Sequence, residues 1–437
     1  MRIVDFFDTE FKEFSSLDNV RSIPSLVDGF KDSQRKAVYA MMLQGNNEIK
    51  VSQFASQAAL KTSYHHGEVS MCDTIVNLAQ NFTGSNNVNL FEPIGQFGSI
   101  LSSVSASPRY IFTKPSSYLR EYFKLEDDCI LEHNYEDGER IEPKYFLPVL
   151  PMWIVNGAVG IGTGHSVKIL ARDPDKVKQA IKKMIKSQYL TDKEKTDLLS
   201  PYFKDWVGDV IEVEPGKFEL HGKFEIVNAT TIRITELPVG YGIDKFKQIL
   251  ADLIDSNKIK DYDNMSTEDG FNFEIKVARE VTRLSEDDIK KLFKLVSRQT
   301  ENITLWSSSN PSFLKQYESI YNALLEFVVF RLEKYEDRRL KQIEILKDEC
   351  IFLEQKKLFI LEWNKLDNVG KYKLDFLKQH MMQKGVDELH LDRLFSLRLT
   401  SLSRDLITEL SEQIQSKKIT IQNLESTNAN QMYLKEL

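Results

Sequence analysis

The sequence predicts an α+β chain of several domains that ends in two long helical arms. Three observations support this class. Apolar residues recur at helical spacing in the first 165 residues, strand and helix patterns mix from 166 to 308, and a helical spacing then continues from Ser312 for roughly fifty residues. With 437 residues, of which 41% are hydrophobic and 28% charged, the chain is long enough for two to four domains with their own cores.

Residues 1–165 are expected to form a mainly helical domain with some strand. The pattern predicts a helix capped by Ser33 that ends near Met42, a second helix from Val51 to Ala58, and a third that starts after Gly67. The third helix places its apolar residues on one face: Cys72, Ile75, Val76, Ala79 and Phe82.

Residues 166–308 predict an α+β domain. Segment 218–226 predicts a hairpin that turns at Gly222, and segment 231–238 predicts a strand that a proline ends. Helical patterns at about 244–257 and 285–297 flank further strands.

Residues 309–437 predict two helical arms joined by a short apolar segment. Neither Gly nor Pro interrupts the first arm before Gly370, and a helix of this length must pack against another. Its apolar steps are Leu314, Tyr317, Tyr321, Leu324, Val328, Leu332 and Tyr335. The expected partner is the C-terminal segment, with a seam, broken by Lys417, of Ile407, Leu410, Ile414, Ile421 and Leu424.

Cysteine and apolar content narrow the class of protein. Cys72, Cys129 and Cys350 lie far apart, which argues against a zinc site or a disulfide framework and indicates a reducing, cytoplasmic setting. The N-terminus lacks a hydrophobic signal core, and the longest apolar run, 149–155, is too short to span a bilayer. We therefore expect no membrane partner.

The distribution of charge is compatible with a local DNA surface. The whole chain carries a net charge of −7, which alone would not suggest DNA. Residues 20–125, however, contain ten Lys or Arg against seven Asp or Glu, a net charge of +3. This local excess supports DNA binding only weakly.

Five short motifs follow one another in the first 165 residues. They are DGFKDSQRK at 28–36, YHHGE at 64–68, EPIGQFG at 92–98, ASPRYIFT at 106–113 and NGAVGIGTG at 156–164. In this order they resemble the DNA breakage-reunion region of type IIA DNA topoisomerases. The resemblance is to the cleavage half of the eukaryotic enzyme and to the medium subunit of T4-like phage topoisomerases, and it runs from about Asp18 to the C-terminus.

The resemblance implies a domain organisation. It implies a winged-helix domain at 1–165 that carries the catalytic tyrosine, followed by an α/β tower domain at 166–308. An antiparallel coiled coil would follow, with arms at 309–365 and 403–437. Its tip at 366–402 would be a small helical exit-gate domain through which two copies dimerise.

The resemblance also implies the chemistry. Tyr110 would attack a DNA phosphodiester and become a 5′-phosphotyrosine, which conserves the energy of the broken bond. A phenol with a pKa of about 10 is mostly protonated at neutral pH, so it must lose its proton on attack. Arg109 would offer donors to the negative charge of the transition state. His66 would contact the scissile phosphate and accept a proton, and Arg35 would face the same phosphate.

Without the resemblance, ordinary structural roles are an alternative interpretation of these side chains. A histidine just before a helix start is favoured in its neutral form, but the pair formed with His65 would more often be surface or capping residues. Arg35 stands at a basic helix start, which is usually a solvated face.

Further DNA contacts are expected at Lys31, Lys36, His65, Gln96 and Ile161. Phosphate contacts position a duplex without reading its sequence, so we expect weak sequence preference. Ile161 lies between glycines, and the resemblance makes it an apolar wedge between base pairs. The alternative is a glycine-rich strand turn that packs Ile161 in a core. A P-loop is rejected, because no Lys-Ser or Lys-Thr follows.

Metal and nucleotide sites are expected on another chain. The sequence shows no convincing metal-binding motif, and 261–263 (Asp-Tyr-Asp) is interpreted as a loop. The resemblance implies that Mg²⁺ and ATP are bound by a partner subunit with ATPase and TOPRIM domains. This division is that of T4-like phages, which would place the protein in the cytoplasm of a bacterial host. A fragment of a longer enzyme is the alternative.

The sequence thus predicts the DNA-cleavage subunit of an ATP-dependent type II topoisomerase, whose partners are duplex DNA, a second copy of itself and the ATPase/TOPRIM partner subunit. A catalytically silent winged-helix and coiled-coil architectural protein is the main alternative. The joint presence of Arg35, His66, Arg109 and Tyr110 favours the enzyme. A coiled-coil scaffold without a DNA role and a tyrosine recombinase fit the charge distribution and the motif order less well.

Overall fold

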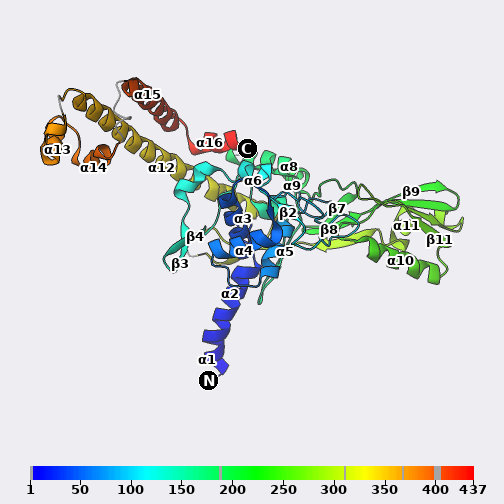
Figure 1. The fold of residues 1–437 in the computed structure, drawn as a ribbon. Coiled ribbons are helices and arrows are strands. Elements are labelled where there is room, and N and C mark those ends of the chain that lie inside the picture. Colours follow the sequence, from blue (N-terminus) through cyan, green and yellow to red (C-terminus); the bar gives the residue numbers. More distant parts are fainter. Residues whose placement is uncertain (1–2, 187–188, 310–311, 367–368, 398–404) are drawn as a thin grey trace. The chain divides into compact units, whose positions relative to one another are not determined.

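The computed structural model describes residues 3–186, 189–309, 312–366, 369–397 and 405–437, and it mixes helices and strands as expected (Figure 1). The chain forms two compact units. The first comprises the residues up to Arg331 together with Leu437, and the second comprises Leu332–Glu436. Among the described residues, none of the helices has the length and apolarity needed to cross a bilayer. The five-part division into domains stays a prediction.

Three helices that pack against one another form the centre of the first unit: α3 (Asp32–Gln44), α4 (Val51–Lys61) and α5 (Glu68–Ala79). Buried residues on their facing sides, such as Met41, Phe54 and Met71, make this packing apolar. The three helices predicted here are confirmed. The cap of the first is not Ser33 but Lys31, because the side chain of Gln34 accepts the backbone N–H of Lys31 at 3.0 Å and starts the helix earlier.

Short elements surround these helices. The N-terminal helix consists of α1 (Ile3–Phe6), a π-helical turn (Phe7–Phe11) and α2 (Lys12–Ser22). The later elements are α6 (Ser117–Tyr122), a 3-10 helix (Leu125–Ile130), α7 (Met152–Val155), and three antiparallel pairs: β1 (Ile49–Lys50) with β2 (Phe112–Thr113), β3 (His133–Glu136) with β4 (Glu139–Pro143), and β5 (Ala158–Ile161) with β6 (Ser166–Ile169).

Two antiparallel sheets follow helices α8 (Pro174–Ile185) and α9 (Asp192–Leu199). The three-stranded sheet has the order β13-β8-β7, with β7 (Asp209–Glu214), β8 (Lys217–His221) and β13 (Val296–Thr300). The four-stranded sheet has the order β11-β12-β10-β9, with β9 (Lys223–Asn228), β10 (Thr231–Glu236), β11 (Asp261–Asn264) and β12 (Phe273–Lys276). A 3-10 turn (Val281–Arg283) and the pair β14 (Ile303–Trp306) with β15 (Leu314–Tyr317) complete the unit.

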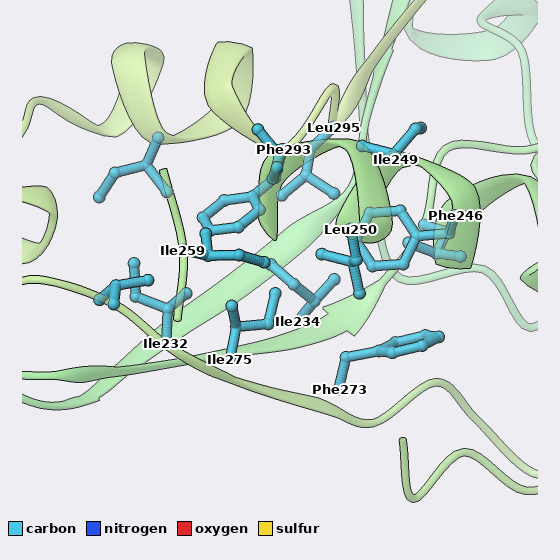
Figure 2. Packing of buried hydrophobic residues seen from close by; sticks show 14 of the residues in the cluster. Ile232, Ile234, Phe246, Ile249, Leu250, Ile259, Phe273, Ile275, Phe293 and Leu295 are labelled. Atoms are coloured by element: carbon cyan, nitrogen blue, oxygen red, sulfur yellow. The ribbon is translucent and has the colours of Figure 1, made fainter. Parts of the chain in front are cut away.

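A separate hydrophobic core lies between the four-stranded sheet and helices α10 (Ile243–Asp255) and α11 (Glu286–Leu292) (Figure 2). Ile232 and Ile234 alternate along β10 and point into this core, as expected for a half-buried strand. Phe246 of α10 meets Phe273 of β12 edge to face, with ring centroids 4.9 Å apart. The core explains why the predicted strand at 231–238 and the helix at 244–257 are both confirmed.

Four local predictions in this region and at the start of the first arm are corrected. The hairpin at 218–226 is wrong, because β8 and β9 belong to different sheets. The helix predicted at 285–297 ends at Leu292, since residues from Val296 pair with β8. Residues 261–263 form edge strand β11 rather than a loop. The first arm starts at Ile320, not Ser312, because Leu314–Tyr317 pairs with β14.

Gly222 is where the chain passes from one sheet to the other. A Cβ atom at this position would lie 2.4 Å from the backbone oxygen of Glu236, a distance that real Cβ atoms do not adopt. The glycine predicted to serve a hairpin turn therefore permits a close approach of two backbones.

The second unit contains an antiparallel pair of long helices. The 44-residue helix α12 (Ile320–Trp363) crosses the unit boundary in sequence, and its later part packs against α15 (Asp405–Ser426). The predicted seam is confirmed, because Leu410, Ile414 and Ile421 are buried. Lys417, which interrupts the seam, forms an ion pair with Glu349 of α12.

Smaller helices complete the second unit: a 3-10 turn (Val369–Lys371), α13 (Leu374–Gln383), α14 (Glu388–Phe395) and α16 (Ala429–Glu436). Helices α13 and α14 pack through Met381 and Leu391 around Phe359 of α12. Part of the segment predicted as an exit gate, 367–368 and 398–402, lies outside the described residues.

The close approach at Gly222 generates a stability prediction. Gly222→Ala should lower the free energy of unfolding by about 1–3 kcal/mol, because the added methyl group overpacks against the Glu236 backbone. Chemical denaturation monitored by fluorescence measures the change. Gly270→Ala is the matched control, since a Cβ atom there meets nothing within 4 Å and should change stability by less than about 0.5 kcal/mol. Equal stability of the two variants would contradict this explanation of Gly222.

Candidate active site

Tyr110 lies on a tight turn that is fixed to the start of helix α4. Its backbone N–H donates to the oxygen of Ser107 at 2.9 Å, which closes the turn. The first two N–H groups of α4, those of Val51 and Ser52, donate to the backbone oxygens of Ile111 and Pro108, each at 3.1 Å. The turn thus satisfies donors that a helix start would otherwise leave unpaired. The side chain of Tyr110 remains 77% exposed, so the phenol is held out into solvent on a rigid base.

The residues 92–98 support this turn from the other side. Ile94 and Phe112 exchange backbone hydrogen bonds of 3.1 and 2.9 Å, and Ala106 donates its N–H to the oxygen of Gln96 at 2.9 Å. Gly95 has a φ of +103°, and a side chain there would press on Ile111. The side chain of Gln96 lies on the exposed surface, as a DNA contact requires.

Arg35 is held by a buried carboxylate. Its Nε donates to Oδ2 of Asp28 at 2.7 Å, and its Nη2 donates to Oδ1 of Asp28 and to the oxygen of Phe30, both at 3.1 Å. Asp28 is fully buried and also accepts the N–H groups of Phe30 and Phe146. Among the described hydrogen bonds, Nη1 of Arg35 is not used, so the guanidinium retains a nitrogen that can face a ligand.

Lys36 does not fit the predicted contact with DNA. Its side chain is buried, and Nζ donates to Oε1 of Glu142 at 2.9 Å and to the oxygen of Thr62 at 2.7 Å. A lysine bound in this way inside the domain cannot reach a phosphate on the surface, so that prediction is wrong. Lys31, by contrast, is half-buried and donates to the oxygen of Val159 at 2.7 Å. Burial lowers the pKa of Lys31.

The two histidines lie in the turn before helix α5. Nε2 of His65 is 2.6 Å from Oε1 of Glu136 on strand β3; the side chain of His65 is 75% exposed and that of Glu136 is 36% exposed. His66 is exposed, and its ring packs edge to face on Tyr64 with centroids 5.2 Å apart. The N-cap of α5 is Gly67, so the histidines stand directly before the helix start, as the sequence predicted.

Ile161 ends strand β5 at the tip of a hairpin, with its side chain 83% exposed. This excludes the alternative that Ile161 packs in a core. The flanking glycines serve close packing: a Cβ at Gly160 would lie 2.1 Å from the oxygen of Ser22, and one at Gly162 would lie 2.2 Å from Oδ1 of Asn19. The hairpin therefore rests on helix α2 and presents a large apolar side chain to solvent.

The structure places the predicted residues on one framework of three packed helices. Arg35 lies in the first turn of α3, the Tyr110 turn caps α4, and His66 precedes α5. Within the described part of the chain, the hydrogen bonds and ion pairs do not join these three side chains to one another.

Several supporting residues escape sequence reasoning. Asp28 stands seven residues before Arg35 in the same motif, a spacing that could have suggested the pair. Nothing in the sequence marks Glu136 or Glu142, which come from a distant hairpin. Among the described residues, the structure contains no group of three or more His, Cys, Asp or Glu side chains that could hold a metal ion.

The buried pair of Asp28 and Arg35 generates a stability prediction. Asp28→Ala should lower the free energy of unfolding by about 3–5 kcal/mol, because it leaves a buried guanidinium and two buried N–H groups without their acceptor. Thermal or chemical denaturation measures the loss. Glu214→Ala, which removes the exposed pair with Lys217, should change stability hardly at all. A mild effect of Asp28→Ala would show that Arg35 does not depend on this carboxylate.

Comparison with known proteins identifies the family. The family model for the A subunit of DNA gyrase/topoisomerase IV matches residues 21–437. Human DNA topoisomerase 2-alpha is 38% identical over 399 residues, which cover 88% of this chain and 25% of the relative. Mouse DNA topoisomerase 2-beta is 36% identical over 395 residues, which cover 88% of this chain and 24% of the relative. The chain thus spans about a quarter of the length of these curated relatives.

A solved structure agrees with this assignment. The DNA-binding, cleavage and re-ligation domain of Plasmodium falciparum topoisomerase II is 33% identical, with a TM-score of 0.91. The match covers 99% of this chain and 63% of the other. The chain therefore belongs to the family of DNA gyrase/topoisomerase IV A subunits, as its motifs predicted.

Proposed function

We propose that this chain is the DNA-cleavage and religation part of a type II DNA topoisomerase, with Tyr110 as the nucleophile. The observation that carries the proposal is the exposed phenol of Tyr110 on a turn fixed to the start of α4, beside an exposed Arg109. Tyr110 lies in the segment ASPRYIFT at 106–113, one of the five motifs that carry the resemblance. The relatives whose sequences are similar to this chain, at 36% and 38% identity, are type II topoisomerases by name.

The proposed reaction is a reversible transesterification. The Tyr110 oxygen attacks a DNA phosphorus, a bond from that oxygen to phosphorus forms, and the bond from phosphorus to the 3′ oxygen breaks. The phenol gives up its proton, and the departing 3′ oxygen takes one up. Because one phosphodiester replaces another, the reverse step reseals the strand without fuel. Arg109 donates to the phosphate oxygens as their charge grows.

Two further side chains are proposed to face the same phosphate. His66 is exposed before a helix start, where a neutral imidazole can accept the phenol proton. Arg35 can offer Nη1, because Asp28 and Phe30 fix the rest of the guanidinium. Arginine held in this way loses little freedom when it binds a phosphate.

Contacts with the duplex are proposed for Lys31, His65, Gln96 and Ile161. Ile161 carries the most specific expectation, since an exposed apolar side chain at a hairpin tip suits insertion between base pairs and bending of DNA. Lys31 bonds to Val159 in the same hairpin, which ties the basic start of α3 to this wedge.

The complete enzyme is proposed to contain more than this chain. Two copies would each cut one strand, and the second duplex would pass through the break and leave between the helical arms. The winged-helix, tower and exit-gate names remain proposals for residues 1–165, 166–308 and 366–402. Mg²⁺ and ATP are expected on an ATPase/TOPRIM partner subunit, in the cytoplasm of a bacterial host if the chain is encoded by a phage.

A trapping assay tests the proposed function. Supercoiled plasmid, Mg²⁺ and a partner that bears a TOPRIM domain are incubated with the chain, and the reaction is quenched with detergent. The wild type should yield protein-linked DNA, and Tyr110→Phe should yield none, because it lacks the nucleophilic oxygen. Tyr135→Phe, which changes a tyrosine that is 68% exposed elsewhere, should behave as the wild type.

Two results would contradict the proposal. Covalent complex that survives Tyr110→Phe would mean that another residue is the nucleophile. Tight duplex binding by the wild type without covalent complex, with every competent partner, would support the architectural alternative.

A further inference from the structure

The turn at 62–67, which carries both histidines, is held at its two ends by one hairpin. At its start, the buried ammonium of Lys36 joins the oxygen of Thr62 at 2.7 Å to the carboxylate of Glu142 on strand β4 at 2.9 Å. Near its end, His65 bonds to Glu136 on strand β3 at 2.6 Å. Strands β3 and β4 pair with each other, so both anchors belong to one hairpin.

The backbone of this turn needs such anchors. Ser63 has a φ of +46°, in the left-handed region that side chains other than glycine rarely adopt. The preceding Thr62 is fully buried, and its hydroxyl donates to the oxygen of Ala58 at 2.7 Å. The following Tyr64 donates its N–H to the oxygen of Ala59 at 3.0 Å. A strained residue thus lies between two residues that hydrogen bonds hold in place.

Contacts extend from the anchored turn to His66. The ring of Tyr64 is buried, its hydroxyl donates to Oγ of Ser70 on α5 at 3.2 Å, and its ring packs edge to face with that of His66. A shift of Thr62 or Tyr64 would therefore move the imidazole of His66. Misplacement of a reacting group by about 1 Å costs up to about 100-fold in rate.

The ion pair itself is not explained by stability alone. Lys36 and Glu142 are both more than nine-tenths buried, and burying two charges costs about as much free energy as their attraction returns. Oε2 of Glu142 lacks a hydrogen-bond partner among the described residues. Because such a pair brings little stability, its purpose is better explained by the hydrogen bond that Lys36 makes to the backbone oxygen of Thr62.

We infer that Lys36 is a positioning residue for His66, and that Glu142 and Glu136 of the β3–β4 hairpin act with it. The ammonium fixes the Thr62 carbonyl, the two carboxylates tie the turn to the hairpin, and the imidazole is thereby held in one position before α5. The inference rests on the proposed function, since it gives these three residues a part in cleavage.

A double-mutant cycle tests the inference. The paired change Lys36→Met with Glu142→Leu removes both buried charges together, so neither is left without a partner. It should slow formation of the covalent complex about 10- to 100-fold and leave affinity for a fluorescent duplex within about two-fold. In a His66→Ala background, the same paired change should slow the reaction by less than about two-fold, because the imidazole it positions is gone.

A matched control removes a buried lysine elsewhere. Lys290→Met takes away an ammonium that is equally buried and paired with Glu286 on α11. Its rate of cleavage should equal that of the wild type in both backgrounds. If the paired variant does not fold, Glu136→Ala, at a partly exposed position, takes its place and must slow cleavage only while His66 is present.

The outcomes separate this inference from the proposed function. Equal slowing in the presence and absence of His66 would overturn the positioning role, as would an unchanged rate in the paired variant or in His66→Ala. If the wild type forms no covalent complex at all, the proposed function fails and the inference fails with it.

Discussion

The buried carboxylate of Asp28 is the interaction on which the candidate site depends. It accepts four hydrogen bonds, two from Arg35 and one each from the backbones of Phe30 and Phe146, and so joins the start of α3 to Phe146. The backbone of Asp28 also accepts the N–H of Met152, and Gly29 allows that close approach: its φ is +78°, and a Cβ would lie 2.3 Å from the backbone nitrogen of Trp153. Because α3 packs against α4 and α5, the same carboxylate indirectly fixes the Tyr110 turn and the histidine turn.

The features that could be predicted from the sequence are those that local spacing of apolar residues determines. The helices near Val51 and Gly67, strand β10 and the seam of α15 are all confirmed, because helical or alternating spacing decides which face is buried. The family, which five short motifs in order predicted, is confirmed by the family model, the relatives and the solved structure. In the structure, three of these motifs become the start of α3, the turn before α5 and the turn that caps α4. Tyr110 and Ile161 lie exposed, which the proposed roles of nucleophile and wedge require.

The corrections concern contacts between residues far apart in the sequence. The local pattern of segment 218–226 predicts a hairpin. In the structure, β8 pairs with β13 and β9 pairs with β10, so the two strands belong to different sheets. Local spacing does not reveal such distant partners. The sequence predicts Lys36 to be a surface cation, but the structure buries it in an ion pair with Glu142, 106 residues away. The same limit hides the contact of Glu136 with His65, 71 residues away. The basic start of α3 therefore contains Arg35, which is suited to bind a phosphate, and Lys36, which bonds to the Thr62 oxygen of the neighbouring turn.

The most direct test of the account is to identify the atom that becomes linked to DNA. Covalent complex formed with a ³²P-labelled duplex is digested with nuclease and protease, and the labelled peptide is sequenced by mass spectrometry. The expected product is a nucleotide joined through its 5′ phosphate to the oxygen of Tyr110. A nucleotide on another tyrosine, or a linkage to a 3′ phosphate, would contradict it.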